Sequence, residues 1–227
     1  MEIIGYIRND YKEKFGIPRQ SGLVTYSESF VEIVPPYNQA EAFRGLRDFS
    51  HIWLLWDFSM AHKECFTATV KPPKLGGNQR MGVWATRSPF RPNNIGLSSV
   101  KLVDILYDNV TGCVSGITVS GADLLDGTPI LDIKPYLPYT DSHPEATGGW
   151  TDHLETMPLK VCIPDNLRNV LESCFSPCQL SALMDTLAQD PRPGYQDEPD
   201  RIYGMLYGDH NIRFSIRDGV LTVVEVK

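Results

Sequence analysis

The stretch RSPFRPNNIGLSS, residues 87–99, joins two apolar runs that predict β-strands, 81–86 and 100–106. Its two prolines restrict the backbone and favour extended geometry in the residues before them, so Arg87 and Arg91 are expected on a rigid loop. Two guanidinium groups and two adjacent amides on such a loop suit a polar or anionic ligand. A stiff, solvated corner of a β-barrel would have the same sequence, and the stretch alone favours neither interpretation.

Short strands separated by turns account for most of the first 140 residues. The candidate strands are 2–8, 30–34, 51–58, 81–86, 100–107 and 113–120. A capping-box pattern, Asn38 with Glu41, predicts one helix that ends near Asp48. The Asp126-Gly127 pair marks a turn. Many short strands with frequent turns are typical of a β-barrel or sandwich.

The chain changes character after a polar stretch, 141–156, which we interpret as a linker. Apolar stripes then predict two helices, over 164–174 and 176–190. The strands expected after them are 202–207, 212–217 and 220–226. The sequence therefore predicts a mainly β protein, with a barrel domain over 1–140 and a small α+β domain over 157–227.

Charge is distributed unevenly along the chain. The net charge is -7, yet the segment 63–101 carries seven basic residues and one acidic residue, Glu64. An acidic protein with such a basic sector can still bind nucleic acid through that sector. A solvated face whose counter-charges lie elsewhere in the fold is the more common outcome for such a run.

Cysteines and apolar runs indicate the compartment. The five cysteines are odd in number and scattered, which fits a reducing cytoplasm better than a disulfide framework. The longest apolar run, 52–56, is far too short to span a bilayer. The N-terminus lacks the features of a signal peptide. We expect a cytoplasmic protein with no membrane partner.

Several common catalytic motifs are missing from the sequence. No Gly-x-Gly-x-x-Gly follows a strand, which argues against a Rossmann dinucleotide fold and against the Rossmann-like methyltransferases. There is no P-loop and no Gly-x-Ser-x-Gly elbow. Cys174 and Cys178 have no second pair, and the histidines show no ligand spacing. We expect a site without metal.

A second proline-held arginine lies in the stretch DPRPGY, residues 190–195. Arg192 stands between two prolines, with Asp190 and Tyr195 alongside. A long loop near the N-terminus, 11–22, contains Arg19 and Gln20 after a proline, and long ordered loops in compact domains tend to be functional. Two such arginine loops in one chain indicate a bipartite site.

These motifs together resemble a known family. The matching segments are YKEKF (11–15), PRQ (18–20), PYNQA (36–40), RGL (44–46), PPKLGGN (72–78), RPNNIG (91–96), DGTP (126–129), DIKPY (132–136) and DPRP (190–193). In order and content they resemble the tRNA methyltransferases that act on N6-threonylcarbamoyladenosine, at position 37 beside the anticodon, through a TsaA-like β-barrel. Asn94 stands where that family more often has proline.

The resemblance implies a fold, a donor and a partner. It implies that S-adenosylmethionine binds on the barrel as methyl donor, that a homodimer completes the site, and that the substrate is the anticodon loop of tRNA. The donor site would draw on Arg19, Gln20, Phe58, Ser59, Arg87, Leu97, Gly127, Thr128 and Pro129. Asp190, Arg192 and Tyr195 would face the target base as catalytic residues.

The expected chemistry is an in-line methyl transfer to a weakly nucleophilic nitrogen. Positioning provides much of the acceleration, and Asp190 or Tyr195 is the candidate acceptor of the N6 proton. Asp190 could instead hold an arginine. Substrate would bind through Arg91, with Lys71 and Lys74 of the basic sector, while Arg87 serves the donor.

Two other functions fit the same residues. One is a non-catalytic barrel module that binds S-adenosylmethionine or a nucleotide, and the other is a scaffolding dimer. The tRNA species chosen, the proton acceptor and the sharing of a site between protomers stay open.

Overall fold

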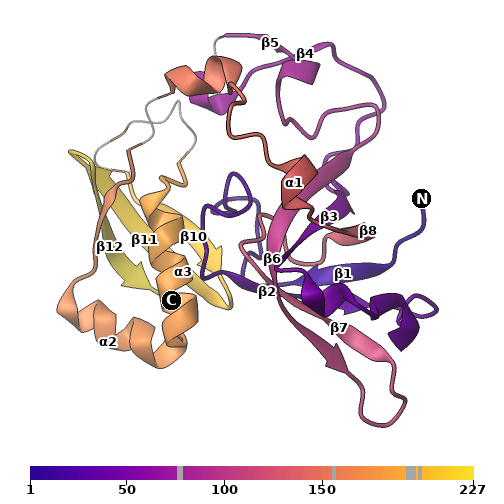
Figure 1. Cartoon of the computed structure of the whole chain (residues 1–227). Coiled ribbons are helices and arrows are strands. Elements are labelled where there is room, and N and C mark those ends of the chain that lie inside the picture. Colours follow the sequence, from indigo (N-terminus) through magenta and orange to yellow (C-terminus); the bar gives the residue numbers. More distant parts are fainter. Residues whose placement is uncertain (76–78, 155–156, 193–197, 199–200) are drawn as a thin grey trace.

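The computed structural model describes the chain except residues 76–78, 155–156, 193–197 and 199–200. In its first part, six strands close into an antiparallel barrel in the order β1-β2-β7-β6-β3-β8 (Figure 1). The barrel strands are β1 (Gly5–Arg8), β2 (Glu28–Ile33), β3 (His51–Asp57), β6 (Ile95–Tyr107), β7 (Val114–Ser120) and β8 (Pro129–Pro135). The predicted mainly β fold with an N-terminal barrel is confirmed.

Alternation along the strands fills the barrel with side chains. In β3, Ile52, Leu54 and Trp56 point inward and are buried, as the period of two requires. Burial of each aliphatic side chain of this size stabilises the fold by roughly 1.5–3 kcal/mol. In the neighbouring β6, a Cβ at Gly96 would overlap the Trp56 indole, so only glycine leaves room for that ring.

A second unit with its own hydrophobic core follows, on the left of Figure 1. Its sheet has the order β10-β11-β12-β9, and helices pack against it. The elements are β9 (Lys160–Cys162), α2 (Asp165–Cys174), α3 (Pro177–Ala188), β10 (Tyr203–Tyr207), β11 (His210–Arg217) and β12 (Val220–Val226). The two predicted helices and three predicted strands are confirmed. The three-residue β9, parallel to β12, was not predicted from the sequence.

A complete capping box begins helix α3. The Ser176 hydroxyl accepts a hydrogen bond from the Gln179 backbone N–H, and the Gln179 side chain accepts one from the Ser176 N–H. These contacts satisfy backbone donors that the first turn leaves without intrahelical partners.

The loop after β1 belongs to the core of the second unit. Tyr11 is 2% exposed and packs there together with Phe15 and Ile17. Tyr11 forms an isolated antiparallel bridge with Tyr207, and the Gly208 N–H donates to the Asp10 carbonyl oxygen at 2.8 Å. A functional role was predicted for the whole loop, but its first half joins the two units by burying aromatic side chains.

The helix predicted from Asn38 to Asp48 is wrong. Two 3-10 turns take its place, η1 (Ala40–Phe43) and η2 (Leu46–Asp48), and no side chain caps the first. Gly45 separates them with a φ of 83°, a left-handed conformation that ends a right-handed helix.

The strand predicted over 81–86 is also wrong for most of its length. Only β5 (Met81–Gly82) pairs, with β4 (Thr69–Val70), and a 3-10 turn η4 (Val83–Ala85) follows. A further 3-10 turn, η3 (Pro73–Leu75), lies before β5. Of the stretch 87–99, only the part to Asn94 is a loop, because β6 already begins at Ile95 and pairs with β3.

The polar stretch 141–156 contacts the first part of the chain in its described residues. It begins at the end of helix α1 (Pro138–Asp141), where the Asp141 carboxylate accepts a hydrogen bond from the Trp53 indole at 2.8 Å. A 3-10 turn η5 (Gly149–His153) follows, and its Trp150 indole donates to the Ala85 carbonyl oxygen at 2.8 Å. In the part of the chain that the structure describes, no helix has the length and apolar character that a bilayer crossing requires.

Candidate functional site

Arg87 and Gln20, far apart in sequence, meet in the structure. A guanidinium nitrogen of Arg87 donates to the Gln20 side-chain oxygen, and the Gln20 side-chain NH₂ donates to the Arg19 carbonyl oxygen. Both ends of the Gln20 amide are therefore engaged. Three of the residues predicted to bind the donor thus form one hydrogen-bonded group.

A half-buried carboxyl group, that of Asp123, lies close enough to Arg87 for the two charges to interact. It accepts a hydrogen bond from the Ser98 hydroxyl at 2.5 Å, and the Ser98 oxygen accepts one from the Trp56 indole at 3.0 Å. Burial raises the pKa of Asp123, and the hydrogen bond from Ser98 and the positive charge of Arg87 partly offset that effect. The charges of Asp123 and Arg87 can therefore interact.

The sequence analysis missed Asp123 and Ser98. The available signal was Ser98 itself, a serine at an inward position of β6 before the inward Val100 and Leu102, because buried hydroxyls need partners. The identity of the partner could not be found from sequence, since Asp123 lies 25 residues further along the chain.

We expect the substitution Asp123→Asn to change how stability depends on pH. The folded protein binds the Asp123 proton more tightly than the unfolded chain, because the pKa is raised from 3.8. The stability of the wild type that depends on this group is therefore lost as pH rises from about 3.8 through the raised pKa. Asparagine does not titrate, so the Tm of the variant minus that of the wild type should increase over this window, measured by thermal unfolding at a series of pH values.

Asp108 provides a control of opposite sign. Hydrogen bonds from Thr111 lower the pKa of Asp108, so this group adds stability as pH rises. The Tm difference for Asp108→Asn should therefore fall with pH. A flat or falling difference for Asp123→Asn would contradict the assignment of a raised pKa.

The 190–192 segment packs against Arg19. One guanidinium nitrogen of Arg19 donates to the carbonyl oxygens of Asp190, at 2.8 Å, and Arg192, at 3.0 Å. Arg192 in turn forms a forked pair with the Asp190 carboxylate, with both N–O distances 2.9 Å. Asp190 has a φ of 51°, which turns the chain directly after α3. Tyr195 lies outside the described residues.

A continuous series of contacts therefore joins the two arginine loops. It runs from Asp190 and Arg192 through Arg19 and Gln20 to Arg87. We name these five residues the arginine cluster. The two arginine loops were predicted to act together, and in the structure both contact the short segment formed by Arg19 and Gln20.

Phe58 and Ser59 follow the end of β3, and Phe58 contacts the loop 87–94. The Phe58 ring lies 4.1 Å from the Trp56 ring, centroid to centroid, and the Phe58 N–H donates to the Asn94 carbonyl oxygen at 2.8 Å. Ser59 is exposed. Leu97 is 56% exposed, because it lies on the outer face of β6, opposite to the inward Gly96 and Ser98.

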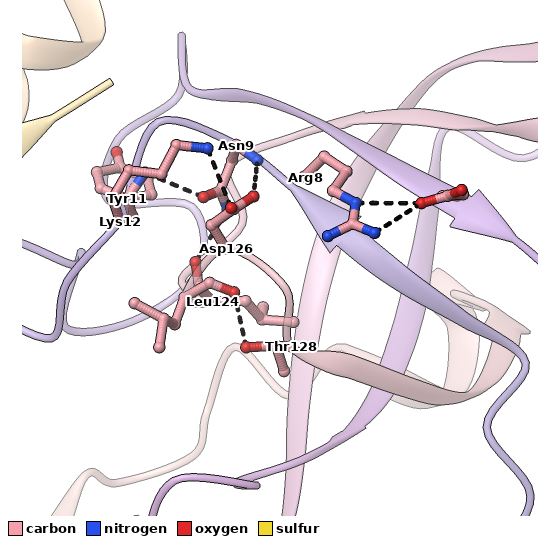
Figure 2. Close-up of polar contacts among 9 residues, drawn as sticks. Arg8, Asn9, Tyr11, Lys12, Leu124, Asp126 and Thr128 are labelled. Carbon is pink, nitrogen blue, oxygen red and sulfur yellow. Dashed lines mark hydrogen bonds and ion pairs between the residues drawn. The ribbon is translucent and has the colours of Figure 1, made fainter. Parts of the chain in front are cut away.

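The turn before β8 joins that strand to β1, as Figure 2 shows for its polar contacts. The Asp126 carboxylate accepts a hydrogen bond from the Asn9 N–H at 2.9 Å and pairs with Lys12 at 3.0 Å. Gly127 has a φ of 76°, and its N–H donates to the Ile7 carbonyl oxygen at 2.8 Å.

Thr128 is buried in this turn, and its hydroxyl donates to the Leu125 carbonyl oxygen at 2.7 Å, while Pro129 begins β8. The turn therefore holds two barrel strands together, and the segment leading into it contains Asp123, whose charge interacts with that of Arg87.

Arg91 points back onto its own loop. Its guanidinium donates to the carbonyl oxygens of Thr86, at 2.7 Å, and Val83, at 3.2 Å, and lies 5.3 Å from the centre of the Trp84 ring. Lys71 is exposed, and Lys74 lies in η3. In the basic sector, Arg91 therefore orders its own loop, whereas Lys71 is exposed.

Two cavities in the described part of the chain lie elsewhere. One, of about 320 Å³, lies between α2 and α3, and the other, of about 230 Å³, lies where Asp10 and Tyr26 meet the start of α3. Neither contains a residue of the arginine cluster. Within the described residues, no three His, Cys, Asp or Glu side chains gather as metal ligands would, and the expectation of a metal-free site stays a prediction.

Comparisons with known proteins match nearly the whole chain. The tRNA-methyltransferase O N-terminal domain matches residues 6–142, and the TrmO C-terminal domain matches residues 156–227. The tRNA (adenine(37)-N6)-methyltransferase of Escherichia coli (strain K12) is 41% identical over 224 residues, which cover 96% of this chain and 93% of that protein.

Two further matches come from Pseudomonas aeruginosa. A putative S-adenosylmethionine-dependent methyltransferase, RcsF, is 39% identical over 239 residues, covering 98% of this chain and 95% of that protein. A crystal structure of TrmO superposes with a TM-score of 0.79 at 33% identity, covering 100% of this chain and 96% of that one.

Proposed function

The chain belongs to the tRNA-methyltransferase O family, and from this premise we propose that it methylates N6 of N6-threonylcarbamoyladenosine at position 37 of tRNA. The methyl donor is S-adenosylmethionine, and the enzyme uses a barrel in place of a Rossmann fold. The observation that supports this most directly is the arginine cluster, which brings the predicted donor-side and acceptor-side arginines into one hydrogen-bonded group.

The residues present fit such a donor. S-adenosylmethionine, when bound, supplies an electrophilic methyl group on a sulfonium. Arg87 can pair with its carboxylate, Gln20 can hydrogen-bond its polar groups, and Phe58 offers a ring for its adenine. We assign the donor site to Arg19, Gln20, Phe58, Ser59, Arg87, Leu97, Gly127, Thr128 and Pro129.

Asp123 is added to this proposal as a positioning residue. Its half-buried carboxyl group accepts a hydrogen bond from Ser98 and lies close enough to Arg87 for the guanidinium charge to offset part of the rise in the Asp123 pKa. A guanidinium held by its hydrogen bond to Gln20 loses less freedom when it binds an anion, and the Asp123 carboxyl group interacts with its charge.

The acceptor side is assigned to Asp190, Arg192 and Tyr195. In the reaction N6 gains the methyl group and loses a proton, which a nearby side chain or water must accept. Both carboxylate oxygens of Asp190 accept hydrogen bonds from Arg192, which favours a positioning role for Asp190. We propose that Arg192 meets the threonine carboxylate or a tRNA phosphate and that Tyr195 is the remaining candidate for proton transfer.

Methylation of two tRNA preparations tests the proposed function. One preparation carries the threonylcarbamoyl group on adenosine 37, and the other is an unmodified transcript of the same sequence. We expect methyl incorporation, measured by mass spectrometry of the nucleosides, in the modified tRNA alone. Equal incorporation into both, or none into either, would count against the proposal.

A homodimer and a cytoplasmic location belong to the same proposal. Ile95 and Leu97 are neighbouring exposed apolar side chains on the outer face of β6, which a second copy could cover. Sedimentation equilibrium should then give about 51 kDa, twice the 25.5 kDa of one chain, and a monomer mass would oppose this. The five free cysteines fit the reducing compartment in which tRNA is modified.

A further inference from the structure

Two large aromatic side chains are exposed on the segment between β3 and β6. Trp84 is 65% exposed and Phe66 is 55% exposed. Their rings stack, with centroids 5.9 Å apart and planes inclined by 24°. This segment also contains β4 and β5, at the top of Figure 1. An exposed pair of stacked rings presents apolar surface that the fold of this chain does not bury.

Surrounding contacts hold Trp84 in its exposed position. Its neighbour Val83 is fully buried and anchors the 3-10 turn η4, so the next side chain points outward. Arg91 lies over the Trp84 indole at 5.3 Å. Its guanidinium donates to the carbonyl oxygen of Val83, where the turn begins, and to that of Thr86, directly after it. The Trp150 indole donates to the Ala85 carbonyl oxygen. The exposure is therefore part of an ordered local structure.

Positive charges lie on the same segment as these rings, and one of them, Arg91, contacts Trp84. The Lys63 ammonium lies 3.7 Å from the centre of the Phe90 ring, and Lys71 and Arg80 are exposed on the same segment. Glu64 is the only acidic residue in the sequence from 63 to 101. Exposed rings interleaved with cations are typical of surfaces that bind single-stranded nucleic acid, where bases stack on the rings and phosphates meet the cations.

Charge complementarity selects RNA over another copy of this protein. If two chains met through this face, the same positive charges would be brought together, which is unfavourable. A tRNA loop carries the opposite charge and has unpaired bases with accessible faces.

We propose that Trp84 and Phe66 form a stacking surface for unpaired bases of the tRNA, next to the nucleotide that is methylated. We name this pair of rings the aromatic platform. Trp84 is three residues before Arg87, so their Cα atoms lie within about 11 Å even in an extended chain. A base stacked on the aromatic platform would therefore lie close to Arg87 of the arginine cluster. This inference rests on the proposed function for the identity of the RNA.

The test compares Trp84→Ala with the wild type in binding to the modified tRNA, by fluorescence anisotropy over a series of salt concentrations. We expect the dissociation constant to rise about 10-fold, because one stacked base is lost. The slope of log K against log salt should stay unchanged, since stacking releases no counterions. Lys63→Ala should instead reduce that slope by about 1. Trp84→Phe should retain most of the affinity.

Controls separate stacking from damage to the fold. Tyr107→Ala removes an exposed ring at the far end of β6 and should leave tRNA binding unchanged. Donor affinity, measured by calorimetry, and Tm should be the same in Trp84→Ala and the wild type. Unchanged tRNA affinity in Trp84→Ala would overturn the inference. So would a loss of donor binding, or a change in sedimentation alone, which would assign the platform to a second copy.

The outcomes also distinguish this inference from the proposed function. If the wild type methylates modified tRNA and Trp84→Ala binds it equally well, only the aromatic platform is refuted. If the wild type binds tRNA through Trp84 but transfers no methyl group to it, the platform stands and the proposed reaction fails.

Discussion

Replacement of Arg87 by alanine should weaken the binding of S-adenosylmethionine by roughly 10- to 100-fold, measured by calorimetry. A charge-assisted hydrogen bond contributes about 1.5–3 kcal/mol, and the guanidinium is proposed to give one to the donor carboxylate. The substitution has two further effects inside the protein. The Gln20 amide loses the group that orients it, and the half-buried Asp123 loses its nearby positive charge.

Arg80→Ala is the matched control for this effect. Arg80 is exposed, lies in the same basic sector and carries the same charge, but has no contact with Gln20 in the described structure. Its loss should change donor affinity less than 2-fold. Arg87→Lys should fall between the two, because an ammonium group cannot reproduce the planar fork of a guanidinium. Equal losses for Arg80→Ala and Arg87→Ala would mean that only overall charge matters.

The same experiment separates catalysis from simple binding. A wild type that binds S-adenosylmethionine but never transfers its methyl group, even to modified tRNA, would support the non-catalytic barrel module. In that case Arg87→Ala would still lose donor binding. The proposed reaction would then be refuted while the donor site is retained.

Asp190→Asn should lower kcat on modified tRNA by about 100-fold while donor affinity stays within 2-fold. Asp190 holds Arg192 through two hydrogen bonds of 2.9 Å, and an asparagine can accept only through one oxygen. Its amide NH₂ would face the guanidinium, so Arg192 would leave its place. A misplaced group near the reacting atoms commonly costs this much in rate.

A double-mutant cycle with Arg192→Ala shows whether Asp190 acts through Arg192. If Asp190 only positions Arg192, the double variant should be no slower than Arg192→Ala alone. If Asp190 accepts the N6 proton itself, the double variant should be slower by a further large factor. The control is Glu198→Gln, which breaks an exposed pair with Arg201 in the same part of the chain and should leave kcat unchanged.

Local signals explain why much of the fold could be predicted. The strand β3 and the start of α3 at Ser176-Pro177 depend on residues near each other in sequence, and both were predicted correctly. The predicted helix near Asn38 failed although its local pattern was present, because Gly45 adopts a left-handed conformation within it. The short β9 has little local signal, since its pairing with β12 supplies its hydrogen bonds.

The candidate site divides in the same way. Residue types and order along the chain were sufficient to single out Arg19, Gln20, Arg87 and Asp190, because proline-held arginines and family motifs are visible in one dimension. The direction in which each side chain points could not be predicted from the sequence. Arg91 turns back onto the carbonyl oxygens of its own loop, whereas Arg87 reaches Gln20 across 67 positions of sequence.

By itself, the sequence determined the family, the mainly β architecture with its α+β C-terminal part, and the arginines around which a methyl-transfer site would form. Only the tertiary structure showed that Ser98 holds the Asp123 carboxyl group near Arg87, that the loop containing Tyr11 lies in the second core, and that Trp84 is held outward. Turns, caps and strand alternation depend on neighbouring residues, so they can be predicted from the sequence. The Asp123 carboxyl group, in contrast, meets Ser98 only when the barrel closes.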